Sequence, residues 1–462
     1  MTAAEATTGD TLSYLCIGSV GTGFLEESLE RGLAMGVDFI GADAGSVDGG
    51  PNALAGVRVG WPDVSYMRDL GLLMRGAKRS GVPLLVGSCG TSGRDWGVDY
   101  FADFARRVAK ESGQKFTVAK IYAEVSPDLV IERLRAGRIH PIEPAPDYDE
   151  DSVRRSIRIV SVMGAEPFQA ALDQGADVVL AGRATDTAIF AAIPLASGLD
   201  PGLAWHAAKI AECGTASAEP KRRLDVLHIE LGQDSFVVQP LADDIRCTPF
   251  SVGAHQLHEV ADPFTLVEPG WITDMTAARY EAASERAVRV SGSVATPAPY
   301  TVKLEGVESA GWQRMFMFGV RDPTILADLD KWIAGIDHDI ATRCEELLGK
   351  GGLERCQTHV RIYGRDGVMG PREPVKQFEG HEAFLVVDVT APDRGTCETA
   401  TSVIWYAFLH AKSPGWRGGT TVAWPFPTAT FDLGEVFRFN VHHAMEVDDP
   451  LETFRIELED IG

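Results

Sequence analysis

The chain has 462 residues, of which 45% are hydrophobic and 24% charged, and its formal net charge is −23 at pH 7. This length fits two or three domains, and the composition is that of a soluble globular protein. The acidic balance argues against nucleic acid and anionic membrane surfaces as partners, because binding to either depends on positive charge. No apolar run reaches the roughly 18 residues of a membrane span. An anionic substrate would need a local arginine or lysine.

The first residues and the cysteines indicate the compartment. Residues 1–11 are mostly small and polar, so we expect a disordered N-terminus. They lack the basic and apolar segments of a signal peptide, which favours a cytoplasmic protein. The seven cysteines are widely scattered and form no CxxC pair. We therefore expect reduced thiols, and neither a disulfide framework nor a structural zinc site.

Residues 12–222 contain a recurrent unit of a short apolar strand, a glycine-rich turn and a helix. The strands expected at 12–17, 82–86 and 178–181 are examples. Such repetition predicts an α/β domain with a mainly parallel, Rossmann-like open sheet. An incomplete (β/α) barrel is the alternative, since a complete eight-fold barrel needs about 250 residues.

The later part of the chain has more β character. We expect an α+β portion at 223–350 packed on the first domain, and a small C-terminal α+β domain at 351–462, with the boundary at the GKGG segment. Trp405, Trp416 and Trp424 lie in the last segment. Exposed aromatic residues there would favour a homo-oligomer, although they also suit a core.

The first turn contains Gly18, Gly21 and Gly23, and Asp43 follows 20 residues after Gly23. This is the approximate spacing of a dinucleotide fingerprint, in which the acid binds a ribose hydroxyl. NAD is therefore one candidate cofactor. The 48 glycines of the chain favour a tight turn without a nucleotide.

Two segments suggest a cation. Asp43, Ser46 and Asp48 follow an expected strand in a loop rich in glycine and aspartate, where they could face a substrate or, through Asp43 and Asp48, a divalent cation. His255 and His258 have the i, i+3 spacing of a metal-binding pair on one helix face. No third ligand is close to them in the sequence, which favours a structural role.

Further polar residues follow the other expected strands. The carboxyl ends of parallel strands share one edge of a sheet, and ligands bind there, so these residues should converge on one cleft. They are Ser88, Thr91 and Arg94 after the strand at 82–86, Glu124 after the strand at 116–122, and Arg183 and Asp186 after the strand at 178–181.

These residue types predict a chemistry. Arg183 or Arg94 would bind a substrate carboxylate or phosphate as a fork. Asp186, Glu124 and Asp43 are the candidate general acids and bases for a proton next to a carbonyl. The alternative for Arg183 and Asp186 is a structural ion pair. Ser88, Thr91, Ser46, Gly21 and Gly23 complete the expected substrate contacts.

Several segments resemble the acyclic terpene utilisation family (AtuA-like). They are IGSVGTGF, RIVSVMGAEPFQAALDQGADVVLAGR, AGRATDTAIFAAIP…AECG and VRVSGSVATPAPYTVKL, which occur in the family's order over about residues 12–345. FDLGEVFRFNV more loosely resembles the small domain that accompanies this family. The resemblance implies a cytoplasmic protein of terpenoid or carboxylic-acid breakdown, and it identifies the fold better than the reaction.

Together these observations favour a lyase, hydratase or isomerase that acts on an organic acid or an acyl-CoA thioester. Two alternatives remain. One is an enzyme with a nucleotide cofactor of the NAD type at Gly18–Gly23, and the other is a non-catalytic scaffold subunit of a catabolic complex.

Overall fold

The computed structural model describes residues 11–57, 60–146, 148–221, 224–375, 380–413 and 421–462. The expected disordered segment 1–11 lies almost wholly outside these ranges. The chain divides into two compact units. The main unit contains the residues up to 308 together with 439–462, and the small unit contains residues 309–438. Because the main unit is discontinuous in sequence, it differs from the consecutive segments expected from composition.

The main unit is built on a mixed ten-stranded sheet. Its central strands are parallel, in the order β1 (Thr11–Ile17), β2 (Phe39–Asp43), β3 (Leu84–Gly87), β7 (Val178–Ala181) and β4 (Phe116–Tyr122). Antiparallel strands extend both sides: β8 (Leu227–Gly232), β9 (Phe236–Pro240), β13 (Val288–Ser291) and β12 (Arg279–Ala282) beyond β1, and β20 (Arg455–Ile461) beyond β4. The expected α/β class is confirmed. The ten strands form an open path that does not close into a complete barrel.

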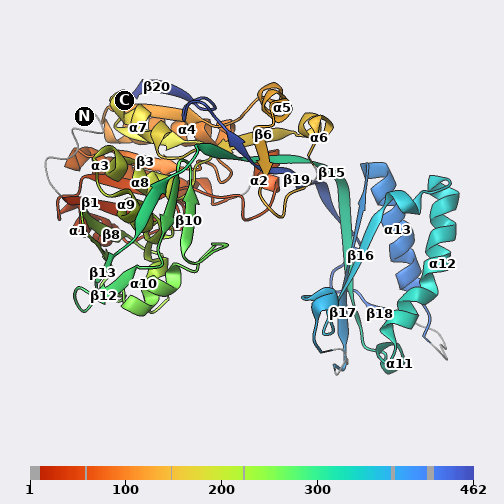
Figure 1. Ribbon diagram of the computed structural model, residues 1–462. Coiled ribbons are helices and arrows are strands. Elements are labelled where there is room, and N and C mark those ends of the chain that lie inside the picture. Colours follow the sequence, from red (N-terminus) through yellow and green to blue (C-terminus); the bar gives the residue numbers. More distant parts are fainter. Residues whose placement is uncertain (1–10, 58–59, 147, 222–223, 376–379, 414–420) are drawn as a thin grey trace. The chain divides into compact units, whose positions relative to one another are not determined.

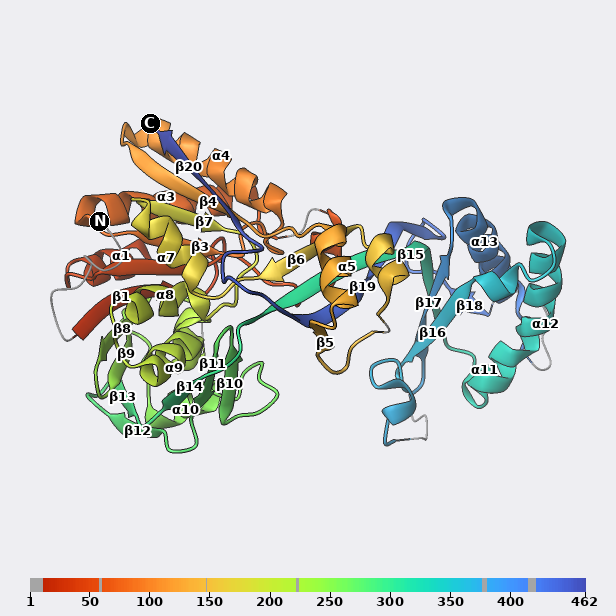
Figure 2. The same ribbon diagram turned by 45° about the horizontal axis from the view of Figure 1, so that its top comes forward.

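Helices cover both faces of the parallel strands (Figures 1 and 2). One face packs against α1 (Glu26–Leu33), α3 (Asp63–Ser80) and α4 (Asp95–Ser112), and the other against α7 (Glu166–Asp173), α8 (Ala188–Ala196) and α9 (Pro201–Ala211). Neighbouring residues of one strand belong to different cores, as Tyr14 and Leu15 do. This follows from the alternation of side chains along a strand. It also explains why these strands read as continuous apolar runs.

Local sequence signals account for several helix ends. Ser126 accepts a hydrogen bond from the Leu129 N–H at the start of α5 (Pro127–Arg135), and Asp149 forms a capping box at α6 (Glu150–Arg155). Gly81 and Gly113 end α3 and α4 in the left-handed conformation. Two short helices, α2 (Asn52–Ala55) and α10 (Pro249–His255), lie outside the repeated units.

The main unit also contains smaller β-structure. β10 (Thr265–Glu268), β11 (Trp271–Asp274) and β14 (Val294–Pro297) form a three-stranded antiparallel sheet. The first half of β15 (Thr301–Val320) pairs with β6 (Arg158–Val162), and the end of β19 (Phe431–Glu446) pairs with β5 (Ile139–Pro141).

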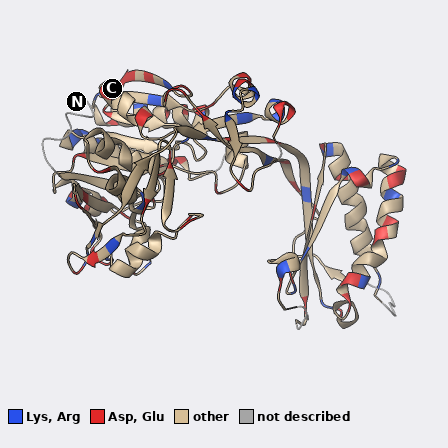
Figure 3. Cartoon of the chain, in the orientation of Figure 1, with Lys and Arg blue, Asp and Glu red and all other residues tan. Residues whose placement is uncertain are grey.

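The small unit is an antiparallel sheet with helices. The second half of β15 pairs with β17 (Ala383–Ala391), which pairs with β16 (Gln357–Tyr363), and β15 also pairs with β18 (Val422–Ala423). Helices α11 (Pro323–Leu326), α12 (Leu329–Leu348) and α13 (Arg394–His410) complete it. Acidic residues recur along α12 (Figure 3).

The small unit holds the tryptophans that were candidates for an oligomer contact. The rings of Trp405 and Trp424 lie 5.8 Å apart, and Trp424 also contacts Phe316 and Phe318. Both tryptophans pack on the core of this unit. Trp416 lies outside the described residues. No helix in the described ranges combines the length and apolarity that crossing a membrane requires.

Candidate functional site

The turns after the parallel strands meet at the carboxyl edge of the ten-stranded sheet, as expected. Backbone hydrogen bonds link them: the Ser88 N–H donates to Gly182 O, and the Arg183 N–H donates to Gly93 O. Gly93 has a left-handed φ of 62°, and a Cβ there would lie 2.2 Å from the Arg183 nitrogen. Glycine is therefore required at this position.

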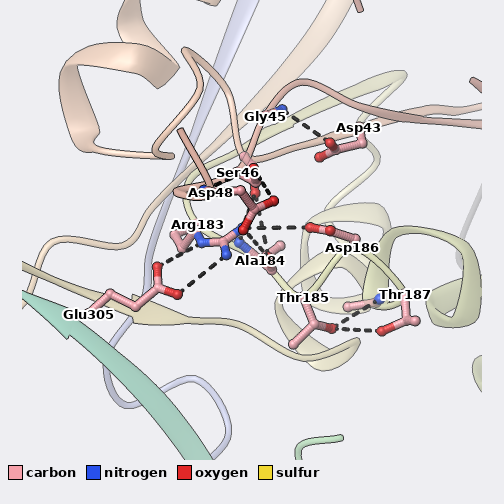
Figure 4. Close-up of polar contacts among 12 residues, drawn as sticks. Asp43, Gly45, Ser46, Asp48, Arg183, Ala184, Thr185, Asp186, Thr187 and Glu305 are labelled. Atoms are coloured by element: carbon pink, nitrogen blue, oxygen red, sulfur yellow. Dashed lines mark hydrogen bonds and ion pairs between the residues drawn. The ribbon is translucent and has the colours of Figure 1, made fainter. Parts of the chain in front are cut away.

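Arg183 is the buried centre of this edge (Figure 4). Its Nε and Nη2 donate to the two carboxylate oxygens of Glu305, at 2.9 and 3.4 Å, and its Nη1 donates to Ser88 Oγ and Ala184 O, both at 3.2 Å. Asp186 Oδ1 lies 3.6 Å from Nη1. The guanidinium is thus satisfied within the protein, and its main partner is Glu305 on β15. This geometry supports a positioning role for Arg183 over a substrate fork.

The charges of this cluster reinforce one another. Burial opposes the charge on Glu305, but Arg183 and Lys303 outweigh it and lower the pKa of Glu305 to about 2. Burial also opposes the charge on Arg183, yet Glu305 and Asp186 raise its pKa. Lys303 Nζ lies 2.8 Å from Glu305 Oε1. Glu305 is therefore ionised and holds Arg183 in place.

Asp43 and Asp186 are the unusual carboxylates of the edge (Figure 4). Burial raises the pKa of both, the charge of Asp186 raises that of Asp43 further, and Arg183 opposes the shift at each. Asp43 Oδ1 and Asp186 Oδ1 are buried without a hydrogen-bond partner in the described structure. Buried polar atoms without partners are rare, and perturbed carboxylates at a strand edge are typical of functional sites.

A second buried group adjoins Asp186, and it was not predicted. Glu268 at the end of β10 accepts a hydrogen bond from Thr187 Oγ1 at 2.6 Å, while its Oε2 has no partner in the described structure. Burial raises the pKa of Glu268 to about 7 and that of Glu212 to about 8, with Asp186 adding to both shifts. Lys209 forms an ion pair with Glu212. Glu268 belongs to none of the segments quoted from the sequence, and the AECG segment that contains Glu212 does not indicate its burial, so only the fold reveals these two groups.

Glu124 and Arg94 form a neighbouring polar group. Glu124 Oε1 lies 2.8 Å from Arg158 Nε and accepts a hydrogen bond from the Asp95 N–H at 3.1 Å. The Glu124 carboxylate, which was expected to act as an acid or base, is therefore occupied by contacts within the protein. Arg94 stacks on Trp96, with the guanidinium carbon 4.4 Å from the ring centroid. It forms no hydrogen bond or ion pair with the described residues.

The electrostatic environment of Arg94 differs from that of Arg183. Burial and the neighbouring Arg158 lower the pKa of Arg94, and Glu124 only partly opposes this. Arg94 lies near the guanidinium of Arg158 and, among the described residues, has no carboxylate hydrogen-bonded to it, so it is suited to binding an anion. Arg94 is therefore the better candidate for the substrate anchor.

A cavity of about 300 Å³ opens at the ends of β1, β2 and β3. Ser46 and Thr91, both expected substrate contacts, line it together with Ser19 and Trp61. Thr91 has a φ of 79° and Ser88 a φ of 49°, which are rare for residues with a Cβ. Strained backbone of this kind concentrates at functional sites.

The glycine-rich first turn does not offer the amides that a dinucleotide needs. The Gly21 and Gly23 N–H groups donate to Asp69 Oδ2 at 2.8 and 3.0 Å. A Cβ on Gly18 would lie 2.3 Å from the carbonyl carbon of Cys213. Internal packing and the Asp69 carboxylate thus explain these glycines, which counts against substrate contacts at Gly21 and Gly23 and against the NAD alternative.

The expected cation pair of Asp43 and Asp48 is not reinforced by further ligands. Asp48 Oδ2 accepts a hydrogen bond from Ser46 Oγ at 2.7 Å, and Asp43 Oδ2 accepts one from the Gly45 N–H at 3.2 Å. Neither belongs to a set of three close metal-binding side chains among the described residues. A cation there would have two protein carboxylates.

A larger cavity, of about 1570 Å³, lies in the small unit between α12 and α13. It is lined by side chains such as Trp332, Tyr406 and Arg343. The carboxylates with raised pKa values at the strand edge, Asp43, Asp186 and Glu268, lie in the main unit. We therefore place the chemistry at the strand edge, although the cavity there is smaller.

The comparisons with known proteins identify the family of the chain. No curated protein and no solved structure matches the chain. The sequence profile described as acyclic terpene utilisation family protein AtuA matches residues 96–217 and 234–443. The matched ranges include Arg183, Asp186, Glu268 and Glu305. They begin after Asp43 and Arg94. They also extend beyond residue 345, where the resemblance was expected to end. Since it covers more than half of the chain, the protein belongs to the acyclic terpene utilisation family AtuA.

Proposed function

We propose that the protein is a catabolic enzyme of the lyase, hydratase or isomerase type, acting on an organic acid or an acyl-CoA thioester. The observation that carries the proposal is the pair Asp43 and Asp186, whose pKa values are both raised. Asp43 is buried and has an oxygen without a hydrogen-bond partner in the described structure, and the partly exposed Asp186 faces Arg183. Carboxyl groups whose pKa is shifted towards the operating pH can both accept and return a proton.

In this proposal Asp186 accepts the proton next to the substrate carbonyl, and Asp43 supplies or receives the second proton. The Asp186 charge raises the pKa of Asp43, so the two groups favour different protonation states. Arg183, which Glu305 holds in place, is a positioning residue that orients Asp186. Arg94 binds the substrate carboxylate or phosphate.

The same evidence bears on the alternatives. The cavity lined by Ser46 and Thr91 supports an enzyme over a scaffold subunit. The contacts of Asp69 with the first turn count against NAD. We also propose a Rossmann-like core for the parallel strands, a cytoplasmic location, no nucleic-acid or membrane partner, and a homo-oligomer.

Hydrogen exchange tests the proposal without knowledge of the full reaction. The purified protein is incubated in D2O with a panel of branched and unsaturated carboxylates and their CoA thioesters, and the proton next to the carbonyl is followed by NMR. We expect exchange, or addition of water, with at least one thioester or acid. Asp186→Asn should slow it by about 100-fold or more, because general base catalysis contributes that much.

Asp151→Asn is the matched control, since Asp151 is an exposed aspartate in the first turn of α6. It should leave the exchange rate unchanged. Thermal unfolding of each variant separates loss of chemistry from loss of fold. The proposal is wrong if the wild type exchanges no member of the panel, or if a folded Asp186→Asn protein exchanges at the wild-type rate.

A further inference from the structure

Three side chains from two distant segments bring different metal-binding atoms together. Glu212 caps the C-terminus of α9, Cys213 follows it, and His255 is the last residue of α10. One carboxylate oxygen, the Cys213 Sγ and one imidazole nitrogen all lie within 4.8 Å of one another. His255, one of the two histidines singled out in the sequence, thus lies beside two further metal-binding side chains from much earlier in the chain.

The imidazole of His255 provides a second, independent observation. The residue is 6% exposed, and its Nε2 has no hydrogen-bond partner in the described structure. Its ring stacks on His258, with centroids 5.5 Å apart, which leaves the nitrogens in the ring plane free for a ligand. A buried nitrogen without a partner costs stability, and a metal ion would satisfy it.

The other two side chains are also available. Lys209 contacts Oε1 of Glu212, and Glu212 Oε2 has no hydrogen-bond partner among the described residues. Cys213 is partly exposed and forms no disulfide. Glu212 and Cys213 both interact electrostatically with Asp186, whereas Lys209 is the cation close to both. Carboxylates outnumber cations here, so a divalent ion would improve the charge balance.

We propose that Glu212, Cys213 and His255 bind a divalent transition metal of the zinc type. A thiolate and an imidazole select zinc-like ions over magnesium or calcium, which prefer oxygen ligands. Three protein ligands leave a fourth position open for water or a substrate oxygen, as in catalytic zinc sites. On binding, the Cys213 S–H bond is replaced by a metal–sulfur bond, and the proton leaves to solvent.

The position of this site links it to the proposed function. Gly18, at the end of β1, packs against the Cys213 backbone, so the three ligands lie at the same carboxyl edge as Asp186. There the ion would polarise a substrate carbonyl, which would make the neighbouring proton more acidic for Asp186. The metal proposal itself rests on the three side chains alone and is tested without a substrate.

Cobalt(II) serves as the probe, because its spectrum reports the ligands directly. Protein treated with a chelator is titrated with Co²⁺, and we expect one ion per chain, a thiolate-to-cobalt charge-transfer band in the near ultraviolet, and displacement by Zn²⁺. Zn²⁺ should also raise the melting temperature, because it binds only the folded protein.

Two matched pairs of variants assign the ligands. Cys213→Ser should abolish the charge-transfer band, and His255→Ala should abolish binding of one equivalent. Cys247→Ser, at a buried cysteine outside the proposed site, and His258→Ala, at the neighbouring exposed histidine, should bind like the wild type. Binding of no cobalt by the folded wild type, or an unchanged band in Cys213→Ser, would overturn the proposal. Neither result depends on catalysis.

Discussion

Arg183→Ala is expected to lower the free energy of unfolding by about 3–5 kcal/mol, the usual cost of removing one partner of a buried ion pair. The variant leaves Glu305, which is 2% exposed, without its bidentate partner. It also removes the charge that stabilises ionised Asp43 and Asp186. Urea unfolding followed by circular dichroism measures the effect. A substrate-binding arginine at an open site would give a much smaller loss.

The pair Arg183 and Glu305 can be dissected further. Glu305→Gln should destabilise less than Arg183→Ala, because the amide oxygen still accepts a hydrogen bond. The double variant Arg183→Met with Glu305→Leu should recover part of the loss, since apolar residues of similar volume often replace a buried pair at little cost. If Arg183→Ala unfolds with the wild-type free energy, Arg183 does not stabilise the carboxyl edge of the sheet.

The ion pair also predicts acid sensitivity. The pKa of Glu305 is lowered to about 2 in the folded protein, from an ordinary value of 4.5. A lowered carboxyl pKa contributes stability that is present above pH 4.5 and is lost as the pH falls towards 2. The difference in stability between wild type and Glu305→Gln should therefore shrink over that interval.

Glu268→Gln should be more stable than the wild type at pH 8, by on the order of 3 kcal/mol, because the raised pKa of Glu268 makes its ionisation in the folded protein unfavourable. The pKa of Glu268 is raised from 4.5 to about 7 by burial and by Asp186, while Thr187 and Lys209 oppose the shift. A raised carboxyl pKa means that the folded protein holds the proton more tightly than the unfolded chain. Wild-type stability therefore falls between pH 4.5 and 7 and stays reduced above 7.

The measurement is urea unfolding of chelator-treated wild type and Glu268→Gln at pH 5 and pH 8. The two proteins should be similar at pH 5, because Glu268 is then protonated in the fold, and glutamine keeps an acceptor for Thr187. Tyr300, Glu212, Thr185 and Asp186 also face this carboxyl and are present in both proteins. Glu281→Gln, on the exposed side of β12, is the control. An equal pH dependence in wild type and Glu268→Gln would contradict the account.

The sequence predicted those parts of the fold that depend on local patterns. The strand, turn and helix repeats up to β7 give the parallel strands, and the polar residues after them converge on one edge. The antiparallel additions β8, β9 and β20 could not be placed, because their pairing is set by contacts far along the chain. Glycines that resembled a nucleotide fingerprint serve packing instead, which spacing alone cannot distinguish.

The sequence also predicted those residues of the site that follow neighbouring parallel strands. Ser88, Arg183 and Asp186 lie together as expected, because neighbouring parallel strands bring them to one edge. The partner of Arg183 was missed, since Glu305 is 122 positions away on a strand whose alternation looks ordinary. Glu268 on β10 was also missed. The proposed metal-binding residues Glu212 and Cys213 follow α9, His255 ends α10, and only the tertiary structure joins them.

The most direct test of the account is the position of a bound ligand in a crystal structure. The ligand would be a thioester or carboxylate from the exchange panel, or any molecule that co-purifies. We expect it at the carboxyl edge of the ten-stranded sheet, with its carbonyl within hydrogen-bond reach of Asp186 and its anionic group at Arg94. Binding between α12 and α13 of the small unit, with the strand edge unchanged, would contradict the central claim.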